Sequence, residues 1–417
     1  MKPKEHFWSD GIIELIETAD IKMTNRVSMT FLNRLLHRDE TTSLKLKTIS
    51  EMCDRHGNEV LQYQEAHARE VLLAHHFNPD TGEPLEGANT ETLQAPVILP
   101  KQQEEIDDYI SAYNESKKDG ITIQMSEKQR AEIESPDGKT IHIALDGVGV
   151  KRQKDKREKL ESKTPSVAKA DTEDDLSAAP KQKGRPSVET SVAHISVGKK
   201  RYVLLAEDMT KLCLLILAFL LEFDLLRDYR LVFLVDGASD IKSALENIFS
   251  FRQYTVLLDW FHLRKHCSET ICMMLRAGKE NRDTQYRIKR TIFRYLWCGN
   301  VQGAIGYIRS LTNDDIRNEN RRKELIGYLE RKEYAIQCYA VRRHLGLTTT
   351  SNPVEKANDL TVACRQKKKC MSWSRHGSRG LAALTALYMN NEDATWHKSH
   401  SLTYEMYEKY GSVMAAA

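Results

Sequence analysis

The chain of 417 residues is too long for one ordinary domain, so two or three domains are expected. Its 41% hydrophobic and 29% charged residues are typical of a globular protein, and 20 glycines and 10 prolines are too few for a collagen-like or generally disordered chain. The 62 Lys and Arg residues and 59 Asp and Glu residues give a net charge of only +3, which by itself argues against a strong polyanion binder.

Residues 1–77 are predicted to form an N-terminal helical domain, because their apolar side chains recur at a spacing of three and four residues. Around Gly57, the segment 46–66 divides into two short amphipathic stretches. This pattern is typical of a helical hairpin or of a DNA-binding helix-turn-helix, and the hairpin is the commoner structure. Proline and glycine residues then indicate a linker, and 78–138 is interpreted as a linker and helical region.

The sequence shows no secretion or membrane signal. Residues 1–5 lead into mixed polar sequence, and the most apolar run, 212–221, is about half the length of a membrane span and predicts a buried helix. The eight cysteines form no CxxC pair, which excludes the usual zinc-finger spacings and favours reduced, buried thiols. We therefore expect a cytoplasmic protein.

An alternation of apolar and polar residues predicts the first strand of a sheet. It covers 141–145 and ends at Asp146-Gly147. The next segment, 151–191, has few large apolar residues and many lysines. It is expected to be a flexible surface insertion.

A β-hairpin is predicted after this insertion, with strands over 191–197 and 201–206 and a turn at Gly198-Lys199-Lys200. Helices and strands then alternate. The elements are a helix around 209–226, a strand over 230–235, a helix through Phe249 that Ser239 or Asp240 can cap, a strand over 254–258, and helices over 262–345.

This order predicts an α/β domain with a ribonuclease-H-like mixed sheet. The first three strands form an antiparallel meander, and the last two follow helical crossovers and run parallel to the first. The first and fourth strands then lie side by side. Asp146 and Asp236 therefore come together at the carboxyl edge of the sheet, where open α/β sheets place their sites.

Asp146 and Asp236 each precede a glycine. Asp-Gly is common turn chemistry, so either residue alone has a simple structural explanation. At neighbouring strand ends, the pair also matches the carboxylates of two-metal phosphoryl-transfer sites, because hard divalent cations take oxygen ligands. The pair predicts a cation site that needs a third acid further along the chain.

Glu355 is the candidate third acid. Asn352 is typical of a helix N-cap and Pro353 of the first helical position, so Glu355 falls third in the helix. Its carboxylate can complete a capping box, or it can face the two aspartates if the helix packs against the sheet edge. Basic and aromatic residues follow closely and favour a phosphodiester substrate, since cations hold phosphates and rings stack on bases. A solvated basic helix face explains the same residues without a ligand.

Asp259 and His262 follow the fifth predicted strand. His262 and His266 have the spacing of zinc ligands on a helix, but Leu263 stands where a zinc hydrolase of that pattern carries its carboxylate. A zinc site is therefore not expected. We expect His262 to contact DNA or stabilise the site, and Asp259 to support it.

Positive charge is concentrated in two segments. From Arg276 to Arg294 there are seven Lys and Arg residues against two acids, and from Arg342 to Arg379 there are nine against two. A solvated helix face or a DNA path explains these segments equally well. Acidic stretches elsewhere offset them, so the near-neutral total does not exclude a DNA partner.

The ordered set Asp146, Asp236, Asp259-x-x-His262 and Glu355 resembles the DDE transposases of bacterial insertion sequences, in the Mutator-like superclass. The block from Asn352 to Asn358, with the basic and aromatic residues after it, is similar to that family's final-glutamate region. The resemblance covers roughly residues 140–390. It implies a ribonuclease-H-like core with an all-helical insertion before the final glutamate, and it makes the lysine-rich insertion a departure from the family.

The same resemblance implies a mobile-element endonuclease and polynucleotidyl transferase, which cuts transposon ends and joins them to target DNA. Asp146, Asp236 and Glu355 would be its catalytic residues and the ligands of two Mg²⁺ ions, with Mn²⁺ as a substitute. The implied partners are double-stranded DNA, as terminal inverted repeats and target, and a second copy of the chain, in the bacterial nucleoid. The alternatives are a ribonuclease-H-like nuclease without strand transfer and a noncatalytic DNA-binding regulator.

The residues expected to contact DNA lie on the helical insertion and around the final glutamate; they are His262, Arg276, Arg290, Arg342, Arg343, Arg365, Lys367, Lys368, Trp373 and Arg375. The predicted domains are the N-terminal helices (1–77), the linker and helical region (78–138), the first part of the core (139–266), the helical insertion (267–345), the final core helices (346–392) and a C-terminal tail (393–417).

Overall fold

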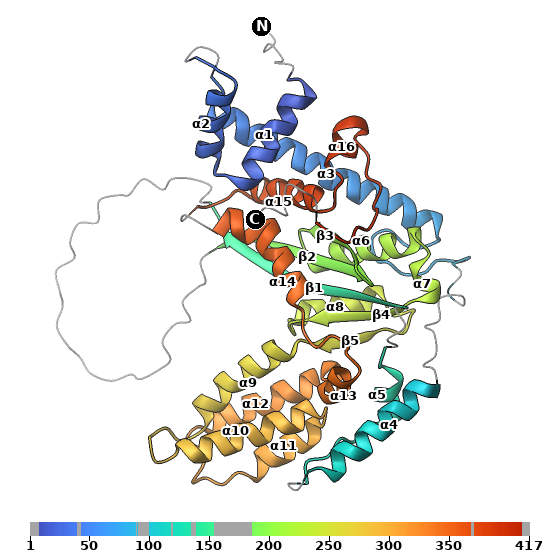
Figure 1. Cartoon of the computed structure of the whole chain (residues 1–417), viewed down its shortest axis with the longest axis vertical. Helices are drawn as coiled ribbons and strands as arrows, with labels where there is room; N and C mark the ends of the chain where they lie inside the picture. Colours follow the sequence, from blue (N-terminus) through green and yellow to red (C-terminus); the bar gives the residue numbers. More distant parts are fainter. Residues whose placement is uncertain are drawn as a thin grey trace, which may run out of the picture.

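A computed structural model of the chain shows a mixed five-stranded sheet between two groups of helices (Figure 1). It describes residues 8–39, 43–88, 90, 100–117, 120–134, 139–153, 186–367 and 371–410. The helices that precede the sheet in the chain are α1 (Asp10–Lys22), α2 (Asn25–Leu35), α3 (Leu46–Ala74), α4 (Pro100–Glu115) and α5 (Glu127–Ala131). The first three pack on one side of the molecule, whereas α4 lies at the opposite end (Figure 1).

The sheet has the strand order β3-β2-β1-β4-β5. Its strands are β1 (Thr140–Lys151), β2 (Ser187–Val197), β3 (Lys200–Ala206), β4 (Arg230–Val235) and β5 (Thr255–Leu258). The strand β1 pairs antiparallel with β2 and parallel with β4, and β2 and β3 form a hairpin. The α/β class, the hairpin and the pairing of the first with the fourth strand are confirmed.

The first hairpin is longer than predicted. The strand β1 continues past Asp146 to Lys151, because Val148 and Val150 extend the alternation and are both buried. Its partner β2 begins at Ser187, so the ends of the predicted 151–191 insertion belong to the sheet. The rest of that insertion, 154–185, lies outside the described residues.

Three helices connect the strands of the sheet: α6 (Met209–Glu222), α7 (Leu225–Asp228) and α8 (Ser239–Ile248). The apolar run 212–221 lies in α6 and is largely buried, as predicted. Within the described residues, no helix combines the length and apolar character needed to cross a membrane. The residue before α8 is Ala238, so the predicted cap by Ser239 or Asp240 is wrong.

Cysteine burial follows the prediction only in part. The seven cysteines in the described residues are free, and five of them are buried. Cys272 and Cys364 are exposed. Both lie on helical segments whose other residues supply the buried face.

A body of helices follows β5 and lies at the end of the molecule opposite α1, α2 and α3 (Figure 1). It consists of α9 (Trp260–Met274), α10 (Arg282–Trp297), α11 (Val301–Ser310), α12 (Glu319–Lys332), the short η1 (Glu333–Ala335) and α13 (Tyr339–His344). The helical character predicted for 267–345 is confirmed. Its apolar side, which includes Ile288, Ile292 and Leu296 of α10, is completely buried.

The chain returns from this body to the sheet through α14 (Asn352–Asn358). This short helix packs against β1 and β2 and continues without a break into a π-helical segment, η2 (Asp359–Lys367). The last helices are α15 (Arg375–Met389) and α16 (Asp393–Ser399). The final glutamate of the predicted triad therefore lies on a helix that packs against the sheet.

Both interpretations of the segment 46–66 are wrong, because α3 is one continuous helix of 29 residues. Gly57 does not make a turn; it lies where α3 crosses α15. A Cβ atom at this position would be 2.0 Å from the carbonyl oxygen of Gly380. The glycine allows two helix backbones to approach closely, which helical periodicity cannot distinguish from a turn.

Candidate functional site

Asp146 and Asp236 lie at adjacent strand ends. The last residue pair of the parallel β1–β4 register is Leu145 with Val235, and the two aspartates are the next residues of each chain segment. Asp146 is still within β1, where it faces Val192 of β2. The sheet topology thus brings two carboxylates from separate parts of the sequence to one edge.

Local turn chemistry also operates at Asp236. Its Oδ1 atom accepts a hydrogen bond from the Ala238 amide at 2.8 Å. Gly237 has φ +95°, a conformation that side-chain-bearing residues rarely adopt, and a Cβ there would lie 2.9 Å from the Leu258 side chain. The Asp-Gly pair therefore shapes the exit from β4 while it leaves the aspartate at the sheet edge.

Glu355 is held by His262 and takes no part in a capping box. Ser351 occupies the N-cap position of α14 without a side-chain cap hydrogen bond, so the predicted N-cap at Asn352 is shifted by one residue. His262 Nε2 lies 2.8 Å from Glu355 Oε1. The side chains of His262 and Glu355 are 33% and 45% exposed, so this contact faces solvent and can exchange for another.

Asp259 joins the helices that carry His262 and Glu355. Its Oδ1 accepts from the His262 amide at 3.0 Å, and its Oδ2 accepts from the amide of Ser351 at 2.5 Å and from its hydroxyl at 3.0 Å. Asp259 is only 1% exposed. One buried carboxylate therefore caps α9 and anchors the start of α14, which sets the relative position of His262 and Glu355.

The three acids share one electrostatic environment. Burial and the neighbouring charges of Asp236 and Glu355 together raise the pKa of Asp146 to about 6, although the Gly147 amide and His262 oppose part of the shift. Among the described residues, no Lys or Arg forms an ion pair with either aspartate, and the ion pair of Glu355 is the one with His262. The edge therefore carries repelling carboxylates that a bound cation would stabilise.

The donor atoms at this edge are carboxylate oxygens, the chemistry that Mg²⁺ and Mn²⁺ prefer. In the described residues, no three His, Cys, Asp or Glu side chains stand close enough together to ligate one ion. Glu355 is directed to His262, and Asp146 is hydrogen-bonded by Asn358 at 2.5 Å. The ligand types fit a hard divalent cation, and Glu355 has to release His262 to join the aspartates.

The residues predicted to contact DNA divide by burial. Arg276, Arg290, Arg343, Lys367 and Arg375 are exposed, and His262 and Trp373 are partly buried. Lys368 lies outside the described residues.

Trp373 is anchored by the sheet as well as by its ring. Its backbone pairs with the end of β1, where the Trp373 amide donates to Lys151 at 2.9 Å. Its indole nitrogen donates to the Gln366 carbonyl at 3.0 Å. These bonds fix the segment between η2 and α15, and they give Trp373 a structural role.

Two predicted DNA contacts, Arg342 and Arg365, are wrong. Arg342 is 1% exposed and forms a bidentate ion pair with Glu134, with one N–O distance of 2.6 Å. Although burial by itself raises the pKa of Glu134, Arg342 and His142 together lower it to about 2.

Arg365 is 5% exposed and donates to the Asp20 carbonyl at 2.7 Å and to Asn25 at 2.6 Å. It ties η2 to α1 and α2. Both guanidinium groups are consumed by internal acids and carbonyls, so neither can reach a phosphate.

Sequence reasoning assigned no role to three residues near the site: Ser351, Asn358 and Lys332. Ser351 binds Asp259, as described above. Lys332 of α12 lies against Gly237; burial lowers its pKa, and the Asp236 carboxylate opposes part of that shift. Only Asn358 had a usable signal, since it follows Glu355 by three residues and so lies on the same helix face.

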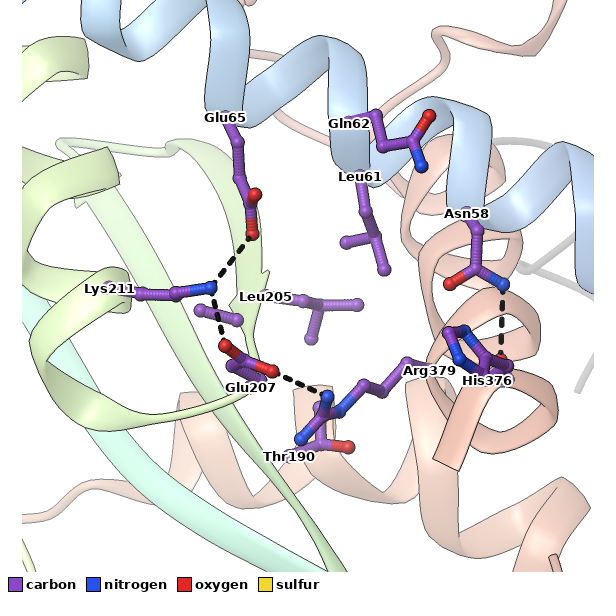
Figure 2. Close-up of a pocket in the computed structure, with 11 residues that line it drawn as sticks. Asn58, Leu61, Gln62, Glu65, Thr190, Leu205, Glu207, Lys211, His376 and Arg379 are labelled. Carbon is purple, nitrogen blue, oxygen red and sulfur yellow. Dashed lines mark hydrogen bonds and ion pairs between the residues drawn. The ribbon is translucent and has the colours of Figure 1, made fainter. Parts of the chain in front are cut away.

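A pocket of about 200 Å³ lies elsewhere, between α3, β3, α6 and α15 (Figure 2). A chain of charges crosses it: Glu65 with Lys211 at 3.7 Å, Lys211 with Glu207, and Glu207 with Arg379 at 2.6 Å. We call these four residues the ion-pair pocket. Its acids and bases satisfy one another, so it differs in kind from the sheet edge.

No known family model matches the chain, and no curated protein is similar to it in sequence. The functional argument therefore depends on the residues and their geometry. The relevant features are three carboxylates at one sheet edge, a histidine bound to one of them, and exposed cations in the helical body and after Glu355.

Proposed function

We propose that the protein is a DDE-type DNA transposase, which cleaves transposon ends and transfers them into target DNA. One observation carries the proposal: Asp146, Asp236 and Glu355 approach one another at the carboxyl edge of the sheet without Lys or Arg partners in the described residues. Partly buried carboxylates that repel one another are unfavourable for folding, so their concentration at one place indicates a functional site.

The architecture supports the proposal at a second level. The order β3-β2-β1-β4-β5, with β2 alone antiparallel to both neighbours, is the arrangement expected for a ribonuclease-H-like core. A helical body separates β5 from α14, as expected for the helical insertion before the final glutamate. Either feature occurs in other proteins, and their combination with the three acids favours this class.

In this function Asp146, Asp236 and Glu355 would hold Mg²⁺, for which Mn²⁺ can substitute. When bound, the divalent ions activate the attacking water or 3′-hydroxyl and stabilise the leaving oxygen. The chain itself positions these groups. Asp259 fixes the starts of α9 and α14, and His262 binds Glu355, which would leave His262 to join the aspartates. Positioning of this kind supplies much of the rate enhancement in phosphoryl transfer.

DNA is the proposed partner, and a homodimer is expected because two transposon ends must be processed. The exposed Arg276, Arg290, Arg343, Lys367 and Arg375 are available for phosphate contacts. Their charge is not consumed by buried acids, unlike that of Arg342 and Arg365. Binding through them would weaken steeply as salt concentration rises.

The test uses the full chain and a plasmid that carries its coding region with the flanking DNA. Wild-type protein with Mg²⁺ should cut both flanks and join the released ends to a second plasmid. Asp236→Asn should abolish both reactions, whereas Asp240→Asn, an exposed aspartate in the following helix, should retain them.

Three outcomes would contradict the proposal in different ways. Cleavage without joining would identify a nuclease. Binding without cleavage would identify a DNA-binding regulator. Full cleavage by Asp236→Asn would show that Asp236 is not a catalytic residue.

A further inference from the structure

Asn358 contacts the proposed cation site directly. It is the last residue of α14, one helical turn after Glu355, and is 6% exposed. Its Nδ2 atom donates to Asp146 Oδ2 at 2.5 Å. Asp146 Oδ1 already accepts from the Gly147 amide at 2.7 Å. The aspartate is therefore held by one backbone and one side-chain donor.

The orientation of the Asn358 amide follows from this contact. A carboxylate only accepts hydrogen bonds, so the NH₂ group of Asn358 must face Asp146 and its Oδ1 must face away. In the described residues, this buried Oδ1 atom has no hydrogen-bond partner. Buried side-chain acceptors without a partner are rare in native structures, and each needs an explanation.

We propose that Asn358 Oδ1 is a fourth oxygen donor to the divalent cation at the sheet edge, beside Asp146. This inference rests on the proposed function and extends it to a residue outside the acid triad. An asparagine carbonyl is a common ligand of hard divalent cations. It completes an oxygen-rich site without adding a negative charge to three carboxylates that already repel one another.

The experiment measures Mg²⁺ affinity by calorimetry, and the Mg²⁺-induced rise in Tm, on the full chain without DNA. Removing the oxygen in Asn358→Ala should weaken Mg²⁺ binding about tenfold or more, the range seen when residues around a metal are lost. Asn352→Ala is the matched control, because Asn352 is an exposed asparagine in the same helix. It should bind Mg²⁺ as wild type does.

Asn358→Asp provides a second variant that keeps an oxygen donor. It places a fourth carboxylate against Asp146, so it should lower the Tm without Mg²⁺ and increase the Mg²⁺-induced rise in Tm. A purely structural asparagine predicts a different result: Asn358→Ala would lower the Tm without Mg²⁺ but leave Mg²⁺ affinity unchanged. That pattern would overturn the inference.

Asp146→Asn separates this inference from the proposed function. If wild type binds Mg²⁺ through Asp146 and Asn358→Ala binds equally well, only the role of Asn358 is wrong. If Asp146→Asn binds Mg²⁺ as tightly as wild type, the cation site itself is wrong, and both proposals are overturned.

Discussion

Negative charge has opposite surroundings in two regions of the molecule. One is the carboxylate edge formed by Asp146, Asp236 and Glu355, and the other is the ion-pair pocket of Figure 2. In the pocket, the hydrogen bond from Lys211 lowers the pKa of Glu207, and Arg379 contributes in the same direction. At the edge, burial and neighbouring acids raise the pKa of Asp146 to about 6. Acids paired with Lys or Arg stabilise the contacts between elements, whereas acids that gather without such partners cost stability and indicate a ligand.

The largest loss of stability is expected at the buried ion pair of Glu134 and Arg342, where each charge is neutralised by the other. Arg342→Met would leave the buried Glu134 without its bidentate partner, with His142 at 3.3 Å as the remaining side-chain contact, and should reduce the free energy of unfolding by about 3–5 kcal/mol. Urea denaturation measures this loss, and Arg343→Met, at an exposed neighbour, is the control. A loss below about 1 kcal/mol would show that the pair does not need its cation.

Glu355→Gln should separate activity from stability at the edge. The change should lower Mg²⁺-dependent DNA cleavage by on the order of 10²–10³-fold, comparable to the loss of one electrostatic stabiliser in other enzymes. The free energy of unfolding should change by less than about 0.5 kcal/mol, because the side chain is half exposed. Glu269→Gln, an exposed glutamate on α9, should alter neither quantity. Equal cleavage by both variants would show that Glu355 is not a catalytic residue.

The pH dependence of folding provides a third contrast. Asp146 has a pKa of about 6 in the folded chain, above its ordinary value of about 3.9 in an unfolded chain. Its carboxylate therefore destabilises the fold above pH 6. This loss of stability disappears as the pH falls towards 4. The penalty at pH 7 is at most about 2–3 kcal/mol, and solvent screening reduces it because the side chain is only partly buried.

Urea titrations of the Mg²⁺-free protein at several pH values measure this penalty. Asp146→Asn should be more stable than wild type at pH 7, and the advantage should shrink at pH 4. Identical pH profiles for the two proteins would show that Asp146 is not strained by its neighbours.

The smallest effect is expected in the ion-pair pocket. Lys211→Met should cost no more than about 1 kcal/mol of unfolding free energy, because its ion pairs are partly exposed and Glu207 keeps Arg379. High salt should reduce the difference between this variant and wild type. A loss as large as that of Arg342→Met would mean that the pocket is desolvated like the protein core.

Much of the sheet was predictable because its signals are local. The continuous apolar run 230–235 coincides with β4, and the hairpin turn falls at Gly198, which has φ +59°. Helical periodicity also identified the body after β5. Where prediction failed, at Gly57 and at the end of β1, one local pattern was compatible with two structures, and distant partners decided between them.

The sequence by itself determined which side chains carry the chemistry: the aspartates after two strands, the later glutamate, and the clusters of cations. Tertiary structure alone decided which charges are free, because compensation depends on residues far apart in the chain. Arg342 meets Glu134 and Arg365 meets Asp20, while Asp146 meets Asn358. A charge is identified by its residue type, but its energy is set by burial and by the charges that folding places beside it.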